Sequence, residues 1–239
     1  MVDIHSHILP KMDDGSKSVE ESMAMLRTSA EQGISVIAAT PHFYPWENNP
    51  EEFLRRREKA AGRLREAWES NLPKIRLGAE VGYFDGVSQA EEIKGLCIEG
   101  TNLLLLEMPF RAWTDRMATE VKALQIKFGV RVILAHVERY LHFQKTLIWE
   151  EMLRTELLAQ CNAEFFISWK TRRRALSMLK EGEIDLIGSD CHNMRSRVPN
   201  IAKALKIIGK DGCKILEENV QRLGLTAEES GSNAEGGTL

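Results

Sequence analysis

Two histidines stand two residues apart near the start of the chain, in the segment Asp3-Ile4-His5-Ser6-His7. Residues two apart in an extended strand point to the same side, so these two imidazoles would share one face. Two neutral imidazoles on one face form half of a metal site. An isolated pair of this kind is a hydrogen-bonded surface feature about as often as it is part of a metal site. The interpretation therefore depends on the ligands that other segments bring.

Later apolar runs also end in histidines or carboxylates. The run 34–40 (ISVIAAT) leads to His42, for example, and the run 130–136 (VRVILAH) finishes at His136. An acidic residue, Asp14, follows the first strand in a loop. The complete set of candidate metal ligands is His5, His7, Asp14, His42, Glu80, Glu107, His136, Asp190 and His192.

This set of imidazoles and carboxylates indicates a site with more than one metal ion. Buried charges of one sign cost several kcal/mol each, so four converging carboxylates require cations. Nitrogen and oxygen donors without thiolate suit Mn, Fe or Zn, and the set is larger than one ion uses. We expect two or three ions. The expected groups are His5, His7 and Asp190 on one ion, Glu80 bridging to a second ion held by Glu107 and His136, and Asp14, His42 and His192 on a third.

Strand and helix patterns alternate along the chain and place the ligands at strand ends. Strands are expected at the start of the chain and at 34–40, 75–81, 102–108, 130–136, 164–168 and 185–189. Helices are expected at 18–32, 50–70, 88–96, 114–128, 146–158, 170–180 and 199–222. The strand at 164–168 brings no obvious ligand. Alternation in units of roughly 30 residues predicts parallel strands with helical crossovers.

The position of the candidate ligands favours a barrel over a doubly wound open sheet. Parallel strands lie ~4.8 Å apart, so an open sheet would spread their ends along a line of ~30 Å, whereas a barrel points them toward one axis. The predicted fold class is therefore α/β, with a distorted (β/α)7 TIM-like barrel. The patterns run without an obvious linker, which predicts a single domain over residues 1–225 and a flexible tail at 226–239.

Composition limits the classes of function. Hydrophobic residues make up 43% of the 239 residues and the net charge is −3, which gives no reason to expect nucleic acid or an anionic membrane as partner. Any basic patch must be local. No stretch approaches the ~20 apolar residues of a membrane span, and no signal peptide is evident, so a cytoplasmic protein is expected. The four cysteines lie far apart without a CxxC motif, which argues against disulfides and thiolate zinc sites.

The segments that carry these ligands resemble a known family. The run DIHSHILPKMDDG, then ATPH, GAE, LLLLEMP, AHVERY and GSDCHN, resemble the polymerase and histidinol phosphatase (PHP) superfamily. They are most similar to its branch of metal-dependent protein-tyrosine phosphatases from bacterial capsule and exopolysaccharide operons. The match covers residues 1 to 222 in the same order, and the start of the chain and HVERY are specific to that branch.

The resemblance implies a seven-stranded PHP barrel, a trinuclear site usually assayed with manganese, and hydrolysis of phosphotyrosine on the tail of a bacterial tyrosine autokinase. Through that kinase the protein would regulate capsule synthesis and meet the membrane only indirectly; a homo-oligomer is possible. The nine ligands correspond to the family's, with Asp14 favoured over Asp13, and Arg139 and Arg197 correspond to its phosphate-contacting arginines. The chain departs from the family between 162 and 180 and at Arg197-Val198-Pro199.

Metal-assisted hydrolysis of a phosphomonoester is the expected reaction. Arg139 and Arg197 would hold phosphoryl oxygens, and His42 or a water would protonate the leaving group. The aromatic residues Phe43, Tyr44 and Trp46 follow a ligand and are expected either to form a rim for an aromatic ring or to pack the loop.

A cysteine mechanism is a competing hypothesis, because Cys191 and Arg197 match the Cys-x5-Arg signature of cysteine-dependent tyrosine phosphatases. The five residues between them contain no glycine for a phosphate loop, and Cys191 alternates with two candidate ligands, so its thiol should point away from the metals. Three more hypotheses compete with tyrosine phosphatase activity. They are a small-molecule phosphatase acting on a compound such as histidinol phosphate, a nuclease-like member of the superfamily, and a non-catalytic scaffold stabilised by metal.

Overall fold

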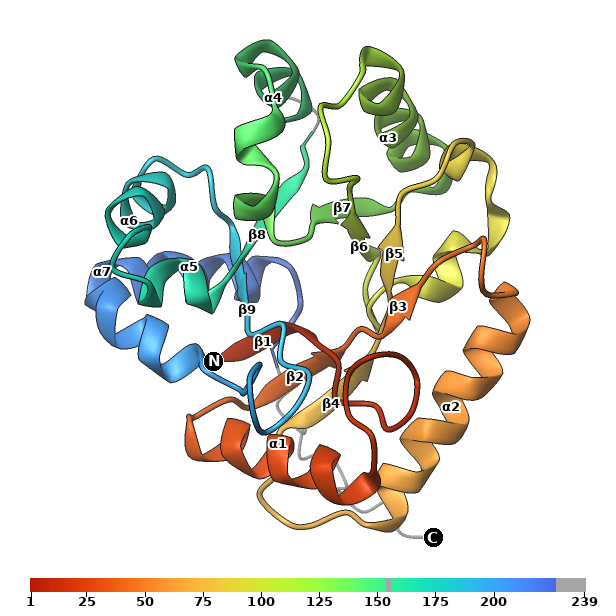
Figure 1. Cartoon of the computed structure of the whole chain (residues 1–239), viewed down its shortest axis with the longest axis vertical. Helices are drawn as coiled ribbons and strands as arrows, with labels where there is room; N and C mark the ends of the chain where they lie inside the picture. Colours follow the sequence, from red (N-terminus) through yellow and green to blue (C-terminus); the bar gives the residue numbers. More distant parts are fainter. Residues whose placement is uncertain (154–155, 227–239) are drawn as a thin grey trace, which may run out of the picture.

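Parallel strands occupy the centre of the molecule, and helices surround them (Figure 1). This computed structural model describes residues 1–153 and 156–226. One sheet has the order β1-β2-β4 and the other the order β3-β5-β6-β7-β8-β9. The strands are β1 (Val2–Ser6), β2 (Val36–Ala39), β3 (His42–Phe43), β4 (Lys74–Leu77), β5 (Glu80–Gly82), β6 (Leu103–Glu107), β7 (Arg131–Leu134), β8 (Leu158–Asn162) and β9 (Leu186–Gly188).

The sheets curl toward each other, but the ladder is interrupted. The expected strand 34–40 stops at Ala39, and Pro41 separates it from β3; the expected strand 75–81 divides into β4 and β5 at Gly78. Proline has no N–H for the ladder and glycine favours a local bend, which accounts for both breaks. A single parallel bridge between Ser6 and Cys191 connects β1 to the other end of the arrangement. The α/β class and the parallel pairing are confirmed as a curled half-barrel sheet, and a complete seven-stranded barrel is not.

Helices follow most of the strands, and the first three begin at side-chain caps. The α-helices are α1 (Val19–Glu31), α2 (Pro50–Glu66), α3 (Asp115–Phe128), α4 (Thr146–Leu153), α5 (Ala163–Ile167), α6 (Arg172–Lys180) and α7 (Ile201–Arg222). Ser18, Asn49 and Thr114 each accept a hydrogen bond from a backbone N–H in the first turn of α1, α2 and α3. In place of the helix expected at 88–96 there are two 3-10 helices, Val87–Gln89 and Glu91–Leu96, because Ala90 between them has extended backbone.

The sixth unit differs from the prediction. The strand lies at Leu158–Asn162, where the expected helix ended, and the expected strand 164–168 is the short helix α5. The sequence EFFIS has strong strand propensity, but α5 instead buries Phe165 and Phe166 against α7. Tertiary packing therefore overrides the local preference. The predicted tail at 226–239 lies outside the described residues from 227 onward.

The inward face of the sheets changes from apolar to polar along each strand. Leu103 and Leu105 share their face of β6 with Glu107, and Leu158 shares its face of β8 with Gln160 and Asn162. The apolar residues join a buried cluster with Ile4, Ala38 and Ile133 at one end of the strands. Polar side chains consequently gather at the carboxyl ends. Within the described part of the chain, no helix is long and apolar enough to cross a membrane.

Candidate metal centre

All nine candidate ligands come together at the carboxyl ends of the strands. The two histidines of β1 and its continuation face each other, with 3.2 Å between the Nε2 atoms of His5 and His7. Glu80 Oε2 lies 3.2 Å from His5 Nε2 and 3.3 Å from His7 Nε2. Asp190 Oδ1 is 3.6 and 3.5 Å from the same two nitrogens. His5, His7 and Asp190 thus form the first expected group.

A second group surrounds Glu80 on the side of β6 and β7. His136 Nε2 lies 2.8 Å from Glu80 Oε1 and 3.3 Å from Glu107 Oε1. His42 Nδ1 lies 3.0 Å from Glu80 Oε2, so Glu80 touches imidazoles from three different strands or strand ends. The position of Glu80 between the groups is the one expected of a bridging carboxylate.

The third group is the most open. Asp14 Oδ1 lies 3.3 Å from His192 Nε2 and 3.6 Å from His42 Nε2, and the Asp14 side chain is 65% exposed. Donor atoms of His7, Asp14, His42 and His192 all lie within 4.8 Å of one another, as do those of His5, His7 and Asp190 and those of His42, Glu80 and Glu107. Compared with the expected groups, His7 joins the third, and His42 takes the place of His136 in the second, although His136 Nε2 still contacts Glu80 and Glu107.

The chemistry of this donor set fits divalent metal ions. The donors are imidazole nitrogens and carboxylate oxygens, a combination suited to Mn, Fe or Zn. Glu80 Oε2 and His192 Nε2 are buried, and neither makes a well-oriented hydrogen bond within the described residues, although ionisable groups lie 3.0 Å and 3.3 Å away. A buried polar atom without a partner costs about 1–3 kcal/mol, and an ion would satisfy both atoms. The residues present therefore fit a cluster of metal ions.

Electrostatics keep the Glu80 carboxylate ionised and the His192 imidazole neutral. Burial would raise the pKa of Glu80, but His5 and the imidazoles hydrogen-bonded to it hold that pKa well below its usual range. Burial together with the positive charge of His7 lowers the pKa of His192 to about 4. Metal ligands must be deprotonated, so both residues are in the form that binds a cation.

Outer hydrogen bonds orient the imidazoles of β1. Gln160 Oε1 lies 3.1 Å from His5 Nδ1 and accepts a bond from the backbone N–H of His136 at 2.8 Å. Asp13 Oδ2 lies 2.7 Å from His7 Nδ1. Such partners fix the tautomer and leave the other ring nitrogen free for a metal. Asp13 and Asp14 thus take different places: Asp13 holds a ring from behind, and Asp14 faces the donor cluster.

Sequence reasoning missed the two amides of β8. Gln160 Nε2 donates to Asn162 Oδ1 at 2.9 Å, and Asn162 Nδ2 donates to Asp190 Oδ2 at 2.8 Å. Polar residues at alternate positions of LAQCN were the available signal, because alternate residues share one face of a strand. The strand expected to carry no ligand therefore supplies the hydrogen bonds that position ligands of three neighbours.

Two of the candidate ligands have unusual backbone conformations. His136 has φ 32° and Asp190 has φ 52°, both in the left-handed region that residues other than glycine seldom adopt. Such strain persists only where the surroundings enforce it, and it is concentrated at functional sites. Here it turns the chain sharply at the ends of β7 and β9, so that each side chain faces the cluster.

The two predicted arginines stand at the entrance to the cluster. Arg139 and Arg197 both form ion pairs with Asp190 Oδ2, and the Arg197 distance is 2.6 Å. Their side chains are 37% and 36% exposed, so each guanidinium has one side toward the ligands and one toward solvent. Both are placed to offer N–H donors to an anion arriving at the metal residues.

Aromatic rings flank the entrance. The rings of His42 and Tyr44 stack with centroids 5.0 Å apart, and Tyr44 stacks on Trp46 at 5.1 Å. On another side, Phe110 stacks on His136 at 5.8 Å. Trp46 and Phe110 are 63% and 49% exposed. A rim for an aromatic ring is thus available, although sequence reasoning had missed Phe110.

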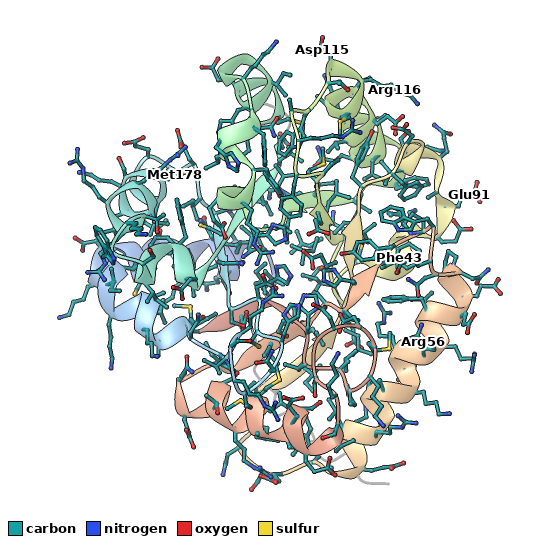
Figure 2. The ribbon with its side chains drawn as sticks, in the orientation of Figure 1. Phe43, Arg56, Glu91, Asp115, Arg116 and Met178 are labelled. Atoms are coloured by element: carbon teal, nitrogen blue, oxygen red, sulfur yellow. The ribbon has the colours of Figure 1, made fainter. Side chains whose placement is uncertain are left out.

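Of the two alternatives given for Phe43, the structure supports packing and not the rim. Phe43 is buried and its ring contacts that of Phe53 on α2, beside which it is labelled in Figure 2. Alternation along β3 explains the difference, since Tyr44 and His42 point to the opposite side. Beyond this rim a cleft of about 530 Å³ extends from Asp14 and His42 past Tyr44 to Arg56, which Figure 2 labels on α2.

Cys191 is not part of the entrance. Its side chain is buried in the hydrophobic core, and burial raises the pKa of its thiol far above the usual range. A nucleophilic cysteine needs a lowered pKa and access to substrate, and Cys191 has neither.

An incomplete parallel α/β barrel with histidines and carboxylates converging at its strand ends defines a class of metal-dependent hydrolases. A family model described as "Capsular polysaccharide synthesis, CpsB/CapC" matches residues 1–227. The chain belongs to this CpsB/CapC family.

Individual relatives agree with the family assignment. The chain is 29% identical over 224 residues to the tyrosine-protein phosphatase CpsB of Streptococcus agalactiae, covering 88% of this chain and 90% of the relative. It is 28% identical over 221 residues to the tyrosine-protein phosphatase YwqE of Bacillus subtilis, with 88% and 85% covered. A solved structure from work on YwqE of B. subtilis and CpsB of Streptococcus pneumoniae, "unique metal-dependent tyrosine phosphatases", superposes with a TM-score of 0.79 and 26% identity. That match covers 93% of this chain and 94% of the other.

Proposed function

We propose that this protein is a metal-dependent protein-tyrosine phosphatase that acts on a phosphorylated protein of capsule or exopolysaccharide synthesis. The observation that supports this proposal most strongly is the convergence of nine imidazole and carboxylate side chains, some of whose buried donor atoms lack a well-oriented hydrogen bond. Two arginines and an aromatic rim stand at the entrance to these side chains. The relatives are named tyrosine-protein phosphatases, and the matching structure is described as metal-dependent. A bacterial tyrosine autokinase with a phosphotyrosine tail is the substrate that this family membership favours.

Two or three ions, which we propose to be manganese, would be held by His5, His7, Asp14, His42, Glu80, Glu107, His136, Asp190 and His192. Bound divalent ions make hydroxide available near neutral pH and stabilise charge on phosphoryl oxygens. We further propose that the two sheets function as one distorted (β/α)7 barrel in a single domain over 1–225, because the Ser6–Cys191 bridge brings the first and last strands together. A cytoplasmic location follows from the proposed substrate.

The chain's own residues orient the substrate. Arg139 and Arg197 would bind phosphoryl oxygens with their N–H groups in exchange for part of their pairing with Asp190. Tyr44, Trp46 and Phe110 would place a phenyl ring at the entrance. A phenolate has a pKa near ~10 and needs less protonation on leaving than an alkoxide does. That proton would come from His42, which is partly exposed beside the cleft, or from a water when His42 holds an ion.

The test compares release of phosphate from a phosphotyrosyl peptide, a phosphoseryl peptide and histidinol phosphate. We expect preferential hydrolysis of phosphotyrosine with manganese and loss of activity with a chelator. Release of phosphate from histidinol phosphate alone would refute the proposed substrate but would not contradict the proposed metal centre. A scaffold without catalysis predicts the same bound metal and no turnover on any of the three.

A further inference from the structure

The most basic stretch of the surface lies between α5 and the first turn of α6. Residues 168–174 read Ser-Trp-Lys-Thr-Arg-Arg-Arg and contain no acidic residue, in a chain whose net charge is −3. Lys170, Arg173 and Arg174 are exposed and form no ion pair with any carboxylate in the described part of the chain. Trp169 beside them is 80% exposed, and Lys170 Nζ lies 5.7 Å from its ring centroid. We name these four residues the basic patch.

The charges of the basic patch oppose the helix they begin. α1, α2 and α3 each have acidic residues in the first turn, as the helix dipole favours, whereas α6 begins with Arg172, Arg173 and Arg174. Cations at a helix amino terminus are unfavourable, because they repel the positive end of the helix dipole. Arg172 donates to the carbonyls of Phe166 and Ile167 and so closes the end of α5. Arg173 and Arg174 have no such structural contact within the described residues, so local stability does not account for them.

One short helix separates the basic patch from the strand end that contacts the metal centre. β8 ends at Asn162, whose amide contacts Asp190, and α5 begins at the next residue. α5 has five residues, which at ~1.5 Å per residue spans only ~7.5 Å before the patch begins. The neighbouring strand, β9, leads into the exposed Arg195 and the half-buried Arg197. Figure 1 shows α5 and α6 side by side with α7 at this edge of the sheet.

We propose that the basic patch binds an acidic segment of the substrate polypeptide next to the phosphotyrosine. Only α5 and Ser168 separate the patch from Asn162, whose amide contacts Asp190, so the patch follows directly from the edge of the sheet that carries the metal residues. Five helical residues and the one or two extended residues after them span roughly 10–15 Å, which corresponds to about three to five residues of an extended peptide. Glutamate or aspartate three to five positions from the phosphotyrosine would therefore pair with Lys170, Arg173 and Arg174, and Trp169 would cover the peptide stem. This assignment rests on the proposed phosphatase function and specifies its substrate.

The test uses two phosphotyrosyl peptides that differ only in carrying glutamate or glutamine three to five positions on each side of the tyrosine. Electrostatic attraction should give the wild type about a tenfold higher kcat/KM on the glutamate peptide at low salt. The preference should shrink as salt rises, because exposed charges are screened. Triple replacement Lys170→Gln, Arg173→Gln and Arg174→Gln should reduce it to within about twofold and leave turnover of p-nitrophenyl phosphate unchanged.

A matched control removes three exposed charges from helices that lie away from α5 and α6. Lys59→Gln and Arg63→Gln on α2 with Lys122→Gln on α3 change the net charge equally and should keep the preference. The patch variant should not unfold at a lower temperature, because it relieves the helix dipole. An unchanged preference in the patch variant, or no preference in the wild type, would overturn the proposal.

Two further measurements separate the remaining outcomes. Calorimetric binding of the unphosphorylated glutamate peptide needs no turnover, so it tests the patch even if the phosphatase assay fails. Sedimentation with phosphatidylserine–phosphatidylcholine vesicles tests the other anionic surface that exposed tryptophan and arginine suit. Patch-dependent vesicle binding without a peptide preference would assign these residues to a membrane and refute the substrate role.

Discussion

β1 and β8 use the same alternation for different chemistry. β1 leads into His5 and His7, and β8 presents Gln160 and Asn162, each pair two residues apart and directed to the same cluster. Imidazole has a lone pair that binds a metal ion, whereas a side-chain amide serves best as a hydrogen-bond partner. The imidazoles of β1 therefore form the centre, and the amides of β8 hold it in shape. The comparison shows that the strand without ligands is as much a part of the site as the strand with two.

The largest effect is expected at the β1 side. His5→Ala removes a donor that faces His7, Glu80 and Asp190. Metal-ion catalysis contributes several kcal/mol and each 1.36 kcal/mol is tenfold in rate, so kcat/KM on phosphotyrosyl peptide should fall by about 10³-fold or more. Elemental analysis should show fewer ions per chain than in the wild type. Full metal content with full activity would exclude His5 as a ligand.

A smaller loss is expected at the β8 side. Gln160→Leu removes the hydrogen bonds to His5 Nδ1 and to the His136 backbone but leaves every candidate ligand in place. Loss of such outer partners typically costs about 10–100-fold in metal affinity or activity. We expect this weakening with unchanged metal stoichiometry at saturating metal, measured by metal titration followed by kinetics.

Gln160→Glu is the matched control, because it keeps an acceptor for His5 Nδ1 while it adds a charge and removes the N–H donor to Asn162 Oδ1. It should retain more activity than Gln160→Leu. If Gln160→Leu loses an ion as His5→Ala does, the proposed difference in role, with metal binding by β1 and orientation of its imidazoles by β8, is refuted.

Adjacent aspartates test the same division within one loop. Asp13 bonds His7 Nδ1 and the His42 backbone from behind, whereas Asp14 faces His42 and His192. Asp13→Asn preserves an acceptor but removes the charge, and we expect a loss of about tenfold with full metal content. Asp14→Ala should instead lose an ion, as judged by elemental analysis. The reverse pattern would exchange the roles of these two carboxylates.

The division also explains what could be predicted from the sequence. Histidine and carboxylate are recognisable as candidate metal ligands where they follow an apolar run, so nine side chains that the structure brings together, and most strands, could be placed in advance. Gln160 could not, because glutamine has many roles and LAQCN precedes EFFIS, which has the stronger strand propensity. Packing of Phe165 and Phe166 against α7 decides that competition, and such a contact between distant segments is absent from any local pattern. Pro41 and Gly78 are visible in the sequence, but their effect on closure of the barrel could not be predicted, because it depends on how neighbouring strands pair.

The smallest effect is expected at Cys191, which lies between Asp190 and His192 at the end of β9. Its thiol is buried away from the entrance, on the other side of the chain from its two neighbours. Cys191→Ser changes one atom in the core and should leave kcat/KM within about threefold, at a stability cost of roughly 1–3 kcal/mol for a buried hydroxyl without a partner. Steady-state kinetics below the unfolding temperature measure the first effect, and thermal unfolding measures the second.

His136→Ala provides the contrast for Cys191→Ser, because His136 Nε2 contacts both Glu80 and Glu107. Activity should vanish in His136→Ala and persist in Cys191→Ser if ions carry the reaction. The opposite result would place the nucleophile on the sulfur and make the Cys-x5-Arg match meaningful. Because Arg197 belongs to both interpretations, only the comparison between the imidazole and the thiol distinguishes them.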